Sequence, residues 1–511
     1  MKILKFLSLL IFSGALFGSC SSKDKVGDEQ IRIIPLPNYY QSQPGVFEMD
    51  KNTVIGVDLS DTNMVSLANY LNEKFMRTTG FGLSIKSASE GIVFTLVEEN
   101  DLGEEGYRMS VTPDGTQIYA NTYHGIFNGI QSFLQLLPLD STGDIAKINC
   151  IDISDKIDVP GHSMALLTAY PEISCTGGPF HVNVGNTFYT KEENSLCVGK
   201  EKTFAILDMI FDELVDLFPS SYIHIGGDEC YKGFWAKCPD CRARMSSKQL
   251  QNVEELQSYF VKRVASHIQS KGKHVIGWDE ILEGGLAKDA IVMSWRGMKG
   301  GVEAARQGHR VIMTPFEHCY LDLYQGDPAV EPNTYSMLRL RDCYKFSIVP
   351  DSIDASFVLG GQGNLWAESI PHYRQVEYMT WPRAMAISET LWNETDSRNW
   401  DFFIQRVESQ FRYLDRLNVN YARSIYDPII SPSINDGELR IELTTEISGL
   451  DIFYTFDNTN PDCYSNLYTT ALSVPKNATM LKVVTYRGKC PIGKQINLTI
   501  EELKERAKKK E

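Results

Sequence analysis

Runs of apolar residues that end in carboxylates or tryptophans recur through the middle of the chain. The clearest run is Tyr222 to Ile225, which is followed by two glycines and then by Asp228 and Glu229. Its apolar and ring residues predict a buried strand, and the glycines allow a sharp turn where the strand ends. Parallel α/β barrels build their active sites at the carboxyl ends of their strands, so these two carboxylates are candidates for catalysis. The alternative is a helix N-terminus, where acidic residues favour the helix dipole.

Strand and helix patterns alternate from residue 156 to residue 424, which predicts a parallel sheet covered by helices on its faces. Helices are expected at 202–218 and 253–271, before the strand of the acidic pair and before the next strand. The expected strands lie within 222–225, 274–280, 290–295, 310–313 and 357–366. Even with a fragment at 157–163, these fall short of the eight strands of a closed barrel. We therefore expect an α/β fold of the (β/α)8 TIM-barrel type that is incomplete.

An α+β domain is expected before this region, at residues 31–155. A helical pattern at 64–77 is followed by Gly80, a natural C-cap, and the strands within 107–120 have the sequence of a hairpin. Four later apolar residues recur at helical spacing and should pack on the strands: Phe127, Ile130, Leu134 and Leu137.

Short strands and turns dominate the region after the barrel pattern, at residues 425–500. They predict an antiparallel domain of the β-sandwich type. The expected strands are 439–444, 451–456 and 480–486. The charged tail, 501–511, is interpreted as a solvated end.

Residues 1–20 are expected to be a signal peptide rather than part of the fold. Two lysines precede an apolar run from Phe6 to Phe17, which is too short to span a bilayer. Small residues then lead to Cys20, as in a bacterial lipoprotein signal, so Cys20 is the expected site of lipid attachment. The predicted location is the cell envelope, on the outer membrane or in the periplasm, with only a lipid anchor in the membrane. A plain secretory signal is the alternative, because Phe17 stands where such signals usually have leucine.

Composition excludes some partners. The formal net charge of −15 over 511 residues argues against nucleic acid, since phosphate binding needs clustered basic residues. A neutral or amino-sugar ligand is compatible with this charge.

Ten of the 11 cysteines follow Cys20, enough for disulfides in an oxidising compartment. Cys238-x-x-Cys241, with Cys230 and His224 nearby, raises the alternative of zinc, which needs four ligands at a structural site. Because no second Cys-x-x-Cys is present, a disulfide or free buried thiols are favoured. No metal or cofactor is expected.

The motif His224-Ile225-Gly226-Gly227-Asp228-Glu229 resembles the signature of family 20 glycoside hydrolases, the β-N-acetylhexosaminidases. The segments 125–137 and 451–457 also resemble the domains that flank the barrel in this family. The resemblance implies a retaining, substrate-assisted mechanism in which Glu229 is the general acid and base in a partly desolvated pocket. Asp228 would hydrogen-bond the acetamido N–H and orient the substrate's own carbonyl oxygen for attack.

Further residues match the substrate pocket of this family. Three tryptophans at strand ends match its walls, although core packing is the usual role of a single tryptophan. Tyr320 matches the tyrosine that binds the acetamide carbonyl, and His162 matches a histidine near the acidic pair. Asp322 and Glu368 match contacts to outer hydroxyls. The three tryptophans are Trp278, Trp295 and Trp366.

The resemblance fails where the first domain ends, because the first two barrel strands and most of the third have no counterpart. In the family this region supplies an arginine and a further aspartate, and neither can be assigned here. We expect a β-N-acetylhexosaminidase that releases terminal N-acetylglucosamine or N-acetylgalactosamine from a glycoconjugate or oligosaccharide, with reduced activity. The alternative is a catalytically impaired sugar-binding lipoprotein derived from this family, whose open sheet edges would favour aggregation or dimers.

Overall fold

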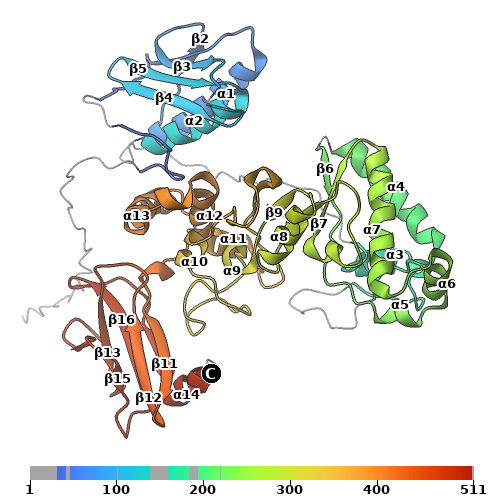
Figure 1. Ribbon diagram of the computed structural model, residues 1–511. Helices are drawn as coiled ribbons and strands as arrows, with labels where there is room; N and C mark the ends of the chain where they lie inside the picture. The colour runs from blue at the N-terminus through green and yellow to red at the C-terminus, as the bar shows by residue number, and fades with distance from the viewer. Residues whose placement is uncertain are drawn as a thin grey trace, which may run out of the picture.

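A computed structural model describes residues 32–41, 46–100, 102–137, 159–182, 194–218 and 220–508. The chain forms an N-terminal sheet with two helices, a central α/β region and a C-terminal pair of sheets (Figure 1). The predicted signal peptide and Cys20 lie outside the described residues. Within the described ranges, no helix is long and apolar enough to cross a membrane.

The N-terminal sheet has the strand order β2-β1-β3-β5-β4. Its strands are β1 (Val54–Gly56), β2 (Ser84–Lys86), β3 (Gly91–Leu96), β4 (Tyr107–Thr112) and β5 (Gly115–Ala120). Only the hairpin of β4 and β5 is antiparallel; the other pairs are parallel. Helices α1 (Thr62–Thr79) and α2 (Tyr123–Leu136) share a core with the sheet. Gly80 ends α1 in a left-handed conformation, with φ 85°, as predicted.

One expectation for α2 was wrong. Phe127 is 38% exposed, and its ring lies 5.3 Å from that of Tyr70 in α1 rather than on the strands. The residues that face the core are Ile126, Ile130 and Phe133. A stripe of three- and four-residue spacing can be drawn through either set, and the sequence pattern alone does not choose between them.

The central sheet has the order β10-β9-β8-β7-β6, and all of its pairs are parallel. Its strands are β6 (Tyr222–His224), β7 (His274–Trp278), β8 (Ile291–Ser294), β9 (Val311–Met313) and β10 (Val358–Gly361). Helix α4 (Glu201–Leu217) precedes β6, α7 (Val253–Ser270) precedes β7, and α8 (Lys299–Arg306) joins β8 to β9. The five strands and the helices α4 and α7 lie where the hydrophobic pattern predicted them, whereas α8 was not predicted.

The expected fragment lies beside β6. The backbone N–H of Val159 donates to the carbonyl of Ile225 at 3.0 Å, directly after β6. Among the described residues, no strand lies beyond Val159 on this side of the sheet or beyond β10 on the other. The described sheet is therefore an open part of a barrel.

Smaller helices complete the central region. They are α3 (Met164–Ala169), α5 (Gly233–Lys237), α6 (Pro239–Lys248), α9 (Phe316–Cys319), α10 (Leu340–Tyr344), α11 (Tyr373–Thr380), α12 (Arg383–Trp392) and α13 (Trp400–Arg416). Single 3-10 turns occur at Pro171–Ile173, Asp279–Leu282, Ala355–Phe357, Thr395–Ser397 and Ser424–Tyr426.

A buried ion pair ties the start of the described chain to the central region. Arg406 in α13 and Glu389 in α12 are each 2% exposed and pair through two hydrogen bonds. Arg406 also donates to the carbonyl of Ile33, and the N–H of Leu36 donates to Glu389. Removing one partner would leave an uncompensated buried charge, so the pair fixes where this segment docks.

The C-terminal region is a two-sheet β-sandwich with a shared apolar core, as expected. One sheet has the order β11-β12-β15 and the other β14-β13-β16-β17, with β18 paired to β16. The strands are β11 (Ile429–Asn435), β12 (Glu438–Thr444), β13 (Asp451–Thr455), β14 (Asn466–Leu467), β15 (Leu472–Ser473), β16 (Met480–Arg487), β17 (Cys490–Pro491) and β18 (Ile496–Thr499).

The interpretation of the tail as a solvated end was wrong. Helix α14 (Ile500–Lys508) buries Leu503 and Ala507 against the sandwich. Arg506 donates to both carboxylate oxygens of Asp327, at 2.6 and 2.9 Å. The two apolar positions are four residues apart, and their helical spacing is easily missed among so many charges.

Candidate active site

The acidic pair follows a tight turn at the carboxyl end of β6. Gly226 and Gly227 have φ values of 74° and 95°, which favour glycine. A Cβ on Gly227 would also lie 2.7 Å from Cγ2 of Ile281, so no side chain fits there. The N–H of Trp278 donates to the carbonyl of Gly226 at 2.8 Å and fixes the turn to the end of β7.

Asp228 and Glu229 differ in their environments. Asp228 is 9% exposed, whereas the side chain of Glu229 is 57% exposed. The Nε2 atom of His162 lies 3.3 Å from Oδ2 of Asp228 and 3.6 Å from Oε2 of Glu229. The structure thus brings His162 to both carboxylates.

The backbone is strained at both residues of the contact between His162 and Glu229. Glu229 and His162 have φ values of 45° and 47°, a left-handed conformation that is uncommon for residues other than glycine. Gly161 packs so closely that a Cβ there would lie 2.7 Å from the carbonyl oxygen of Asp228. Strained residues of this kind persist where the surrounding structure holds them and cluster at active sites.

Aromatic rings from four strand ends form a continuous wall beside the pair. The Trp278 ring lies 6.0 Å from that of Trp366, and Tyr320 lies 6.4 Å from Trp366 and 6.1 Å from Trp295. The His224 ring packs edge-on against Trp278 at 5.0 Å. The three candidate tryptophans and Tyr320 therefore belong to one site rather than to separate parts of the core.

The hydroxyl of Tyr320 lies inside this wall. Burial raises the pKa of Tyr320, and the negative charges of Asp322 and Asp228 act in the same direction. Hydrogen bonds from Trp366 and Asn364 oppose this effect. The phenol therefore keeps its proton at neutral pH and can donate a hydrogen bond to a ligand.

Asp322 is the buried acceptor of the site. Its Oδ2 accepts a hydrogen bond from the Tyr335 hydroxyl at 2.6 Å, while its buried Oδ1 has no hydrogen-bond partner among the described residues. Burial raises the pKa of Asp322, and the nearby charge of Glu368 adds to this rise. An unpaired buried carboxylate oxygen is costly unless a ligand hydroxyl satisfies it.

Three residues that the sequence did not single out position the candidates. Tyr335 holds Asp322 through its hydroxyl. The fully buried Arg383 donates to the carbonyls of Leu321 and Leu323, on either side of Asp322. No local pattern marks either residue, because both act across the fold.

The third residue, Glu280, follows β7 beside Asp279. Its Oε2 accepts a hydrogen bond from the Trp295 indole at 3.0 Å, and burial raises the pKa of Glu280 to about 7. Asp279 is 1% exposed and accepts from Arg296 at 2.6 Å. The available signal was a second pair of carboxylates at a strand end. The sequence also allowed Asp279 and Glu280 to be only a helix start, and they do begin the 3-10 turn at Asp279–Leu282.

Comparisons with known proteins agree with this geometry. A model described as "Glycosyl hydrolase family 20, catalytic domain" matches residues 143–395, and one for domain 2 of that family matches 30–156. A beta-hexosaminidase of Porphyromonas gingivalis is 30% identical over 92% of this chain and 75% of its own length. The chain belongs to glycoside hydrolase family 20. A model described as "Fn3 associated" matches residues 441–497.

Other family 20 proteins match over less of their length or at lower identity. A beta-hexosaminidase of Akkermansia muciniphila is 30% identical over 54% of this chain and 56% of its own. The family 20 exo-beta-N-acetylglucosaminidase of Vibrio harveyi, solved with N-acetylglucosamine, has a TM-score of 0.67 at 22% identity, over 77% of this chain and 78% of that one. A Streptomyces plicatus beta-hexosaminidase mutant with bound product has a TM-score of 0.66 at 22% identity, over 77% and 97%. These structures share the fold.

The alignment with the P. gingivalis relative shows that family 20 members can carry residues that this chain lacks. About 470 residues, 92% of this chain, are spread over 591 aligned positions, so about 120 positions fall in gaps of this chain. The partly desolvated pocket expected for Glu229 is not formed by the described residues, since most of its side chain is exposed.

Proposed function

We propose that this family 20 protein hydrolyses terminal β-linked N-acetylhexosamine from a glycoconjugate or oligosaccharide. The observation that carries the proposal is the contact of His162 with both Asp228 and Glu229. Glycoside cleavage needs a proton donor for the leaving oxygen and a group that stabilises positive charge at the anomeric carbon. The two carboxylates supply these roles from adjacent positions.

Glu229 is the proposed general acid and base. Its carboxyl group reaches solvent, so it can give a proton to the departing oxygen and recover one from water in the second step. His162 lies close to both carboxylates and is proposed as a positioning residue.

Asp228 is the proposed partner of the acetamido N–H. It is too buried to attack the anomeric carbon directly, and its neighbour Tyr320 keeps a proton to donate to the acetamide carbonyl. Held between these groups, the carbonyl oxygen of the substrate would itself attack and form an oxazolinium-type intermediate, while the leaving oxygen takes the proton of Glu229. Water that gives a proton to Glu229 would then attack the same carbon and open the intermediate, so the anomeric configuration is retained. Substrate-assisted hydrolysis of this kind does not need a second carboxylate as nucleophile.

The remaining site residues are proposed to bind the sugar. The aromatic wall offers flat apolar faces to the ring and its acetamido methyl group, and Asp322 offers an acceptor oxygen to a hydroxyl. Glu368 is half-buried and close enough to Asp322 to raise its pKa, so it is placed to accept from a neighbouring hydroxyl.

A second function is favoured by the exposure of Glu229. An acid that solvent reaches, in a pocket that the described residues do not enclose, would bind a sugar while catalysing slowly, because lost positioning contacts cost transition-state stabilisation. Under this second function, the protein would be the catalytically impaired sugar-binding lipoprotein named as the alternative from the sequence. Titration with N-acetylglucosamine would detect its binding even without turnover.

Hydrolysis of a chromogenic aryl β-N-acetylglucosaminide tests the proposal. We expect turnover by the purified protein, and loss of at least about a hundredfold in kcat for Glu229→Gln. Glu303→Gln, which removes an exposed carboxylate from α8, is the matched control and should not change the rate. Unchanged turnover in Glu229→Gln would refute the assignment of the acid, and sugar binding without turnover would favour the second function.

We also propose that the protein is a lipoprotein of the cell envelope, anchored through Cys20. The support is the sequence of residues 1–20, with basic, apolar and small-residue segments in order. Cells fed an alkyne fatty acid should label the protein, and Cys20→Ala should abolish the label. Label that persists in this variant would contradict the anchor.

A further inference from the structure

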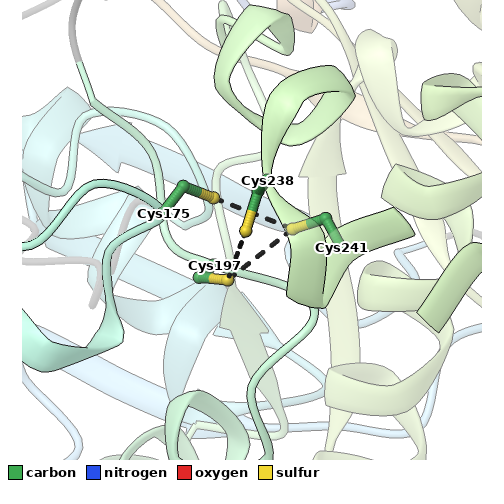
Figure 2. Close-up of side chains that lie close together, drawn as sticks. All are labelled: Cys175, Cys197, Cys238 and Cys241. Carbon is green, nitrogen blue, oxygen red and sulfur yellow. Dashed lines mark hydrogen bonds between the residues drawn. The ribbon is translucent and has the colours of Figure 1, made fainter. Parts of the chain in front are cut away.

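Four cysteines from three separate segments converge on one point in the central region (Figure 2). Cys175 follows the turn at Pro171–Ile173, Cys197 precedes α4, and Cys238 and Cys241 lie at the start of α6. All four Sγ atoms lie within 4.8 Å of one another. Cys175 is half-buried and the other three are buried. We call this group the cysteine cluster.

The separations in the cysteine cluster match those of a tetrahedral metal site. A zinc–thiolate bond of about 2.3 Å places the corners of a regular tetrahedron about 3.8 Å apart. The Sγ of Cys241 lies 3.7 Å from that of Cys175 and 3.6 Å from that of Cys197, and the Sγ of Cys197 lies 3.7 Å from that of Cys238. A disulfide would need an S–S distance of about 2.05 Å. Cys197 and Cys241 each contact two other thiols, so the cluster is not divided into two separate pairs.

We propose that the cysteine cluster binds one structural zinc ion. Four thiolates complete a tetrahedral, all-cysteine site and leave no position for water or substrate, which distinguishes it from a catalytic zinc. Binding would release the thiol protons, since zinc takes cysteine as the thiolate.

The backbone around the cysteine cluster is already held in place. The N–H of Cys197 donates to the carbonyl of Ile173 at 2.7 Å, and the N–H of Cys238 donates to that of Phe234 at 3.0 Å. Gly199 lies so close to the Cys238–Cys241 turn that a Cβ there would meet the carbonyl carbon of Asp240 at 2.2 Å. This close approach is what allows Cys197 to face the pair in α6.

Basic groups bind the same loops. Four thiolates and one Zn²⁺ carry a net charge of minus two, and such a charge is favoured by nearby cations. Lys200 donates to the carbonyls of Glu172 and Ser174, next to Cys175, at 2.9 and 2.8 Å. Arg244 in α6 donates to the carbonyl of Gly199 at 3.1 Å.

Hydrogen bonds connect the segments that carry the cysteine cluster to the segment that carries His162. The indole of Trp235 in α5 donates to the carbonyl of Leu196 at 2.9 Å, and the N–H of Leu196 donates to the carbonyl of Pro160 at 3.1 Å. Pro160 lies two residues before His162. Helices α5 and α6 follow directly from Glu229. The zinc would therefore hold together the segments that carry His162 and the acidic pair, on the β6 side of the central sheet.

The sequence favoured a disulfide or free thiols here, and the reason lies in the spacing. Cys175 and Cys197 are separated by 21 residues, so they do not form the second Cys-x-x-Cys of a typical zinc motif. His224 and Cys230, the nearby residues first considered as ligands, are not part of the cluster. The Nδ1 atom of His224 instead accepts the N–H of Gly226 at 3.0 Å.

Elemental analysis of the purified protein tests the proposal. We expect one zinc per chain, and none in the double variant Cys238→Ser/Cys241→Ser. The control is Cys463→Ser, which replaces a free cysteine of the C-terminal sandwich and should keep the zinc. Replacing the zinc of the unaltered protein with Co²⁺ should produce the intense visible absorption of tetrahedral cobalt thiolate, a result that does not depend on any variant folding.

Two results with the unaltered protein would overturn the proposal. One is a well-folded, metal-free protein that takes up neither zinc nor cobalt and whose cluster thiols all react with a thiol reagent after unfolding. The other is a metal-free protein that gains four reactive thiols only after reduction, which would show two disulfides in the cysteine cluster. Retention of zinc by a folded double variant would place the metal elsewhere and would also overturn it.

Discussion

Glu280 is a buried carboxyl group whose ionisation opposes folding. Burial raises its pKa from 4.5 to about 7, against the smaller opposing effects of the Trp295 hydrogen bond and Arg296. The folded state holds the proton more tightly than the unfolded state. The contribution of Glu280 to stability is therefore complete below pH 4.5 and is lost as the pH rises through 7. The difference between the two pKa values corresponds to about 3 kcal/mol at alkaline pH.

Glu280→Gln isolates this effect. Glutamine keeps an oxygen that can accept the Trp295 indole N–H but carries no charge at any pH. We expect the variant to be more stable than the unaltered protein at pH 8, by about 2 kcal/mol more than at pH 5. Unfolding in urea can be followed by tryptophan fluorescence, because all seven tryptophans lie between Trp235 and Trp400 and report on the central region.

The control for this experiment is Glu303→Gln, whose carboxylate is exposed on α8. It should change stability little, and by the same amount at both pH values. A Glu280→Gln variant whose stability relative to the unaltered protein is the same at pH 5 and pH 8 would refute the reasoning. A variant that is less stable at pH 8 would show that the charged form of Glu280 is the one the fold favours.

Three further changes test other parts of the account. Gly227→Ala adds a Cβ 2.7 Å from Ile281, so urea unfolding should show a larger loss than in Gly308→Ala, which has a similar φ of 86° but nothing within 4 Å; equal losses would mean that the contact is harmless. Arg506→Ala should lower the free energy of unfolding by about 2 kcal/mol and expose α14 to proteolysis, because it leaves the buried carboxylate of Asp327 without its cationic partner. Lys508→Ala, which removes an exposed ion pair with Glu505, should leave stability and proteolysis unchanged and is the control. Tyr320→Phe should lower kcat/KM for an aryl N-acetylglucosaminide by about a hundredfold, and a change of less than twofold would remove Tyr320 from the reaction.

The features that could be predicted from the sequence are those set by local pattern. Apolar runs predicted the five parallel strands, because the hydrophobic pattern that marks a buried strand is contained in a few consecutive residues. The two glycines before Asp228 predicted the turn, since glycine readily adopts the positive φ that the backbone has at both positions. The aromatic wall followed from tryptophans at strand ends, because the carboxyl ends of parallel strands meet at one edge of the sheet.

Contacts across the fold could not be predicted in this way. The cysteine cluster draws on segments whose separation in sequence says nothing about their separation in space. Arg383 holds backbone carbonyls about 60 residues away, which no local spacing reveals. The exposure of Glu229 depends on what the rest of the barrel covers, and the motif is the same whether that wall is present or absent.

The central claim is that the acidic pair uses the acetamido group of its own substrate. The most direct test compares kcat/KM for an aryl β-N-acetylglucosaminide with that for the aryl β-glucoside, which lacks this group. We expect a preference of at least about a thousandfold, because an internal nucleophile gains a large effective concentration. Asp228→Asn should reduce turnover of the first substrate. Similar turnover of both substrates would contradict the account.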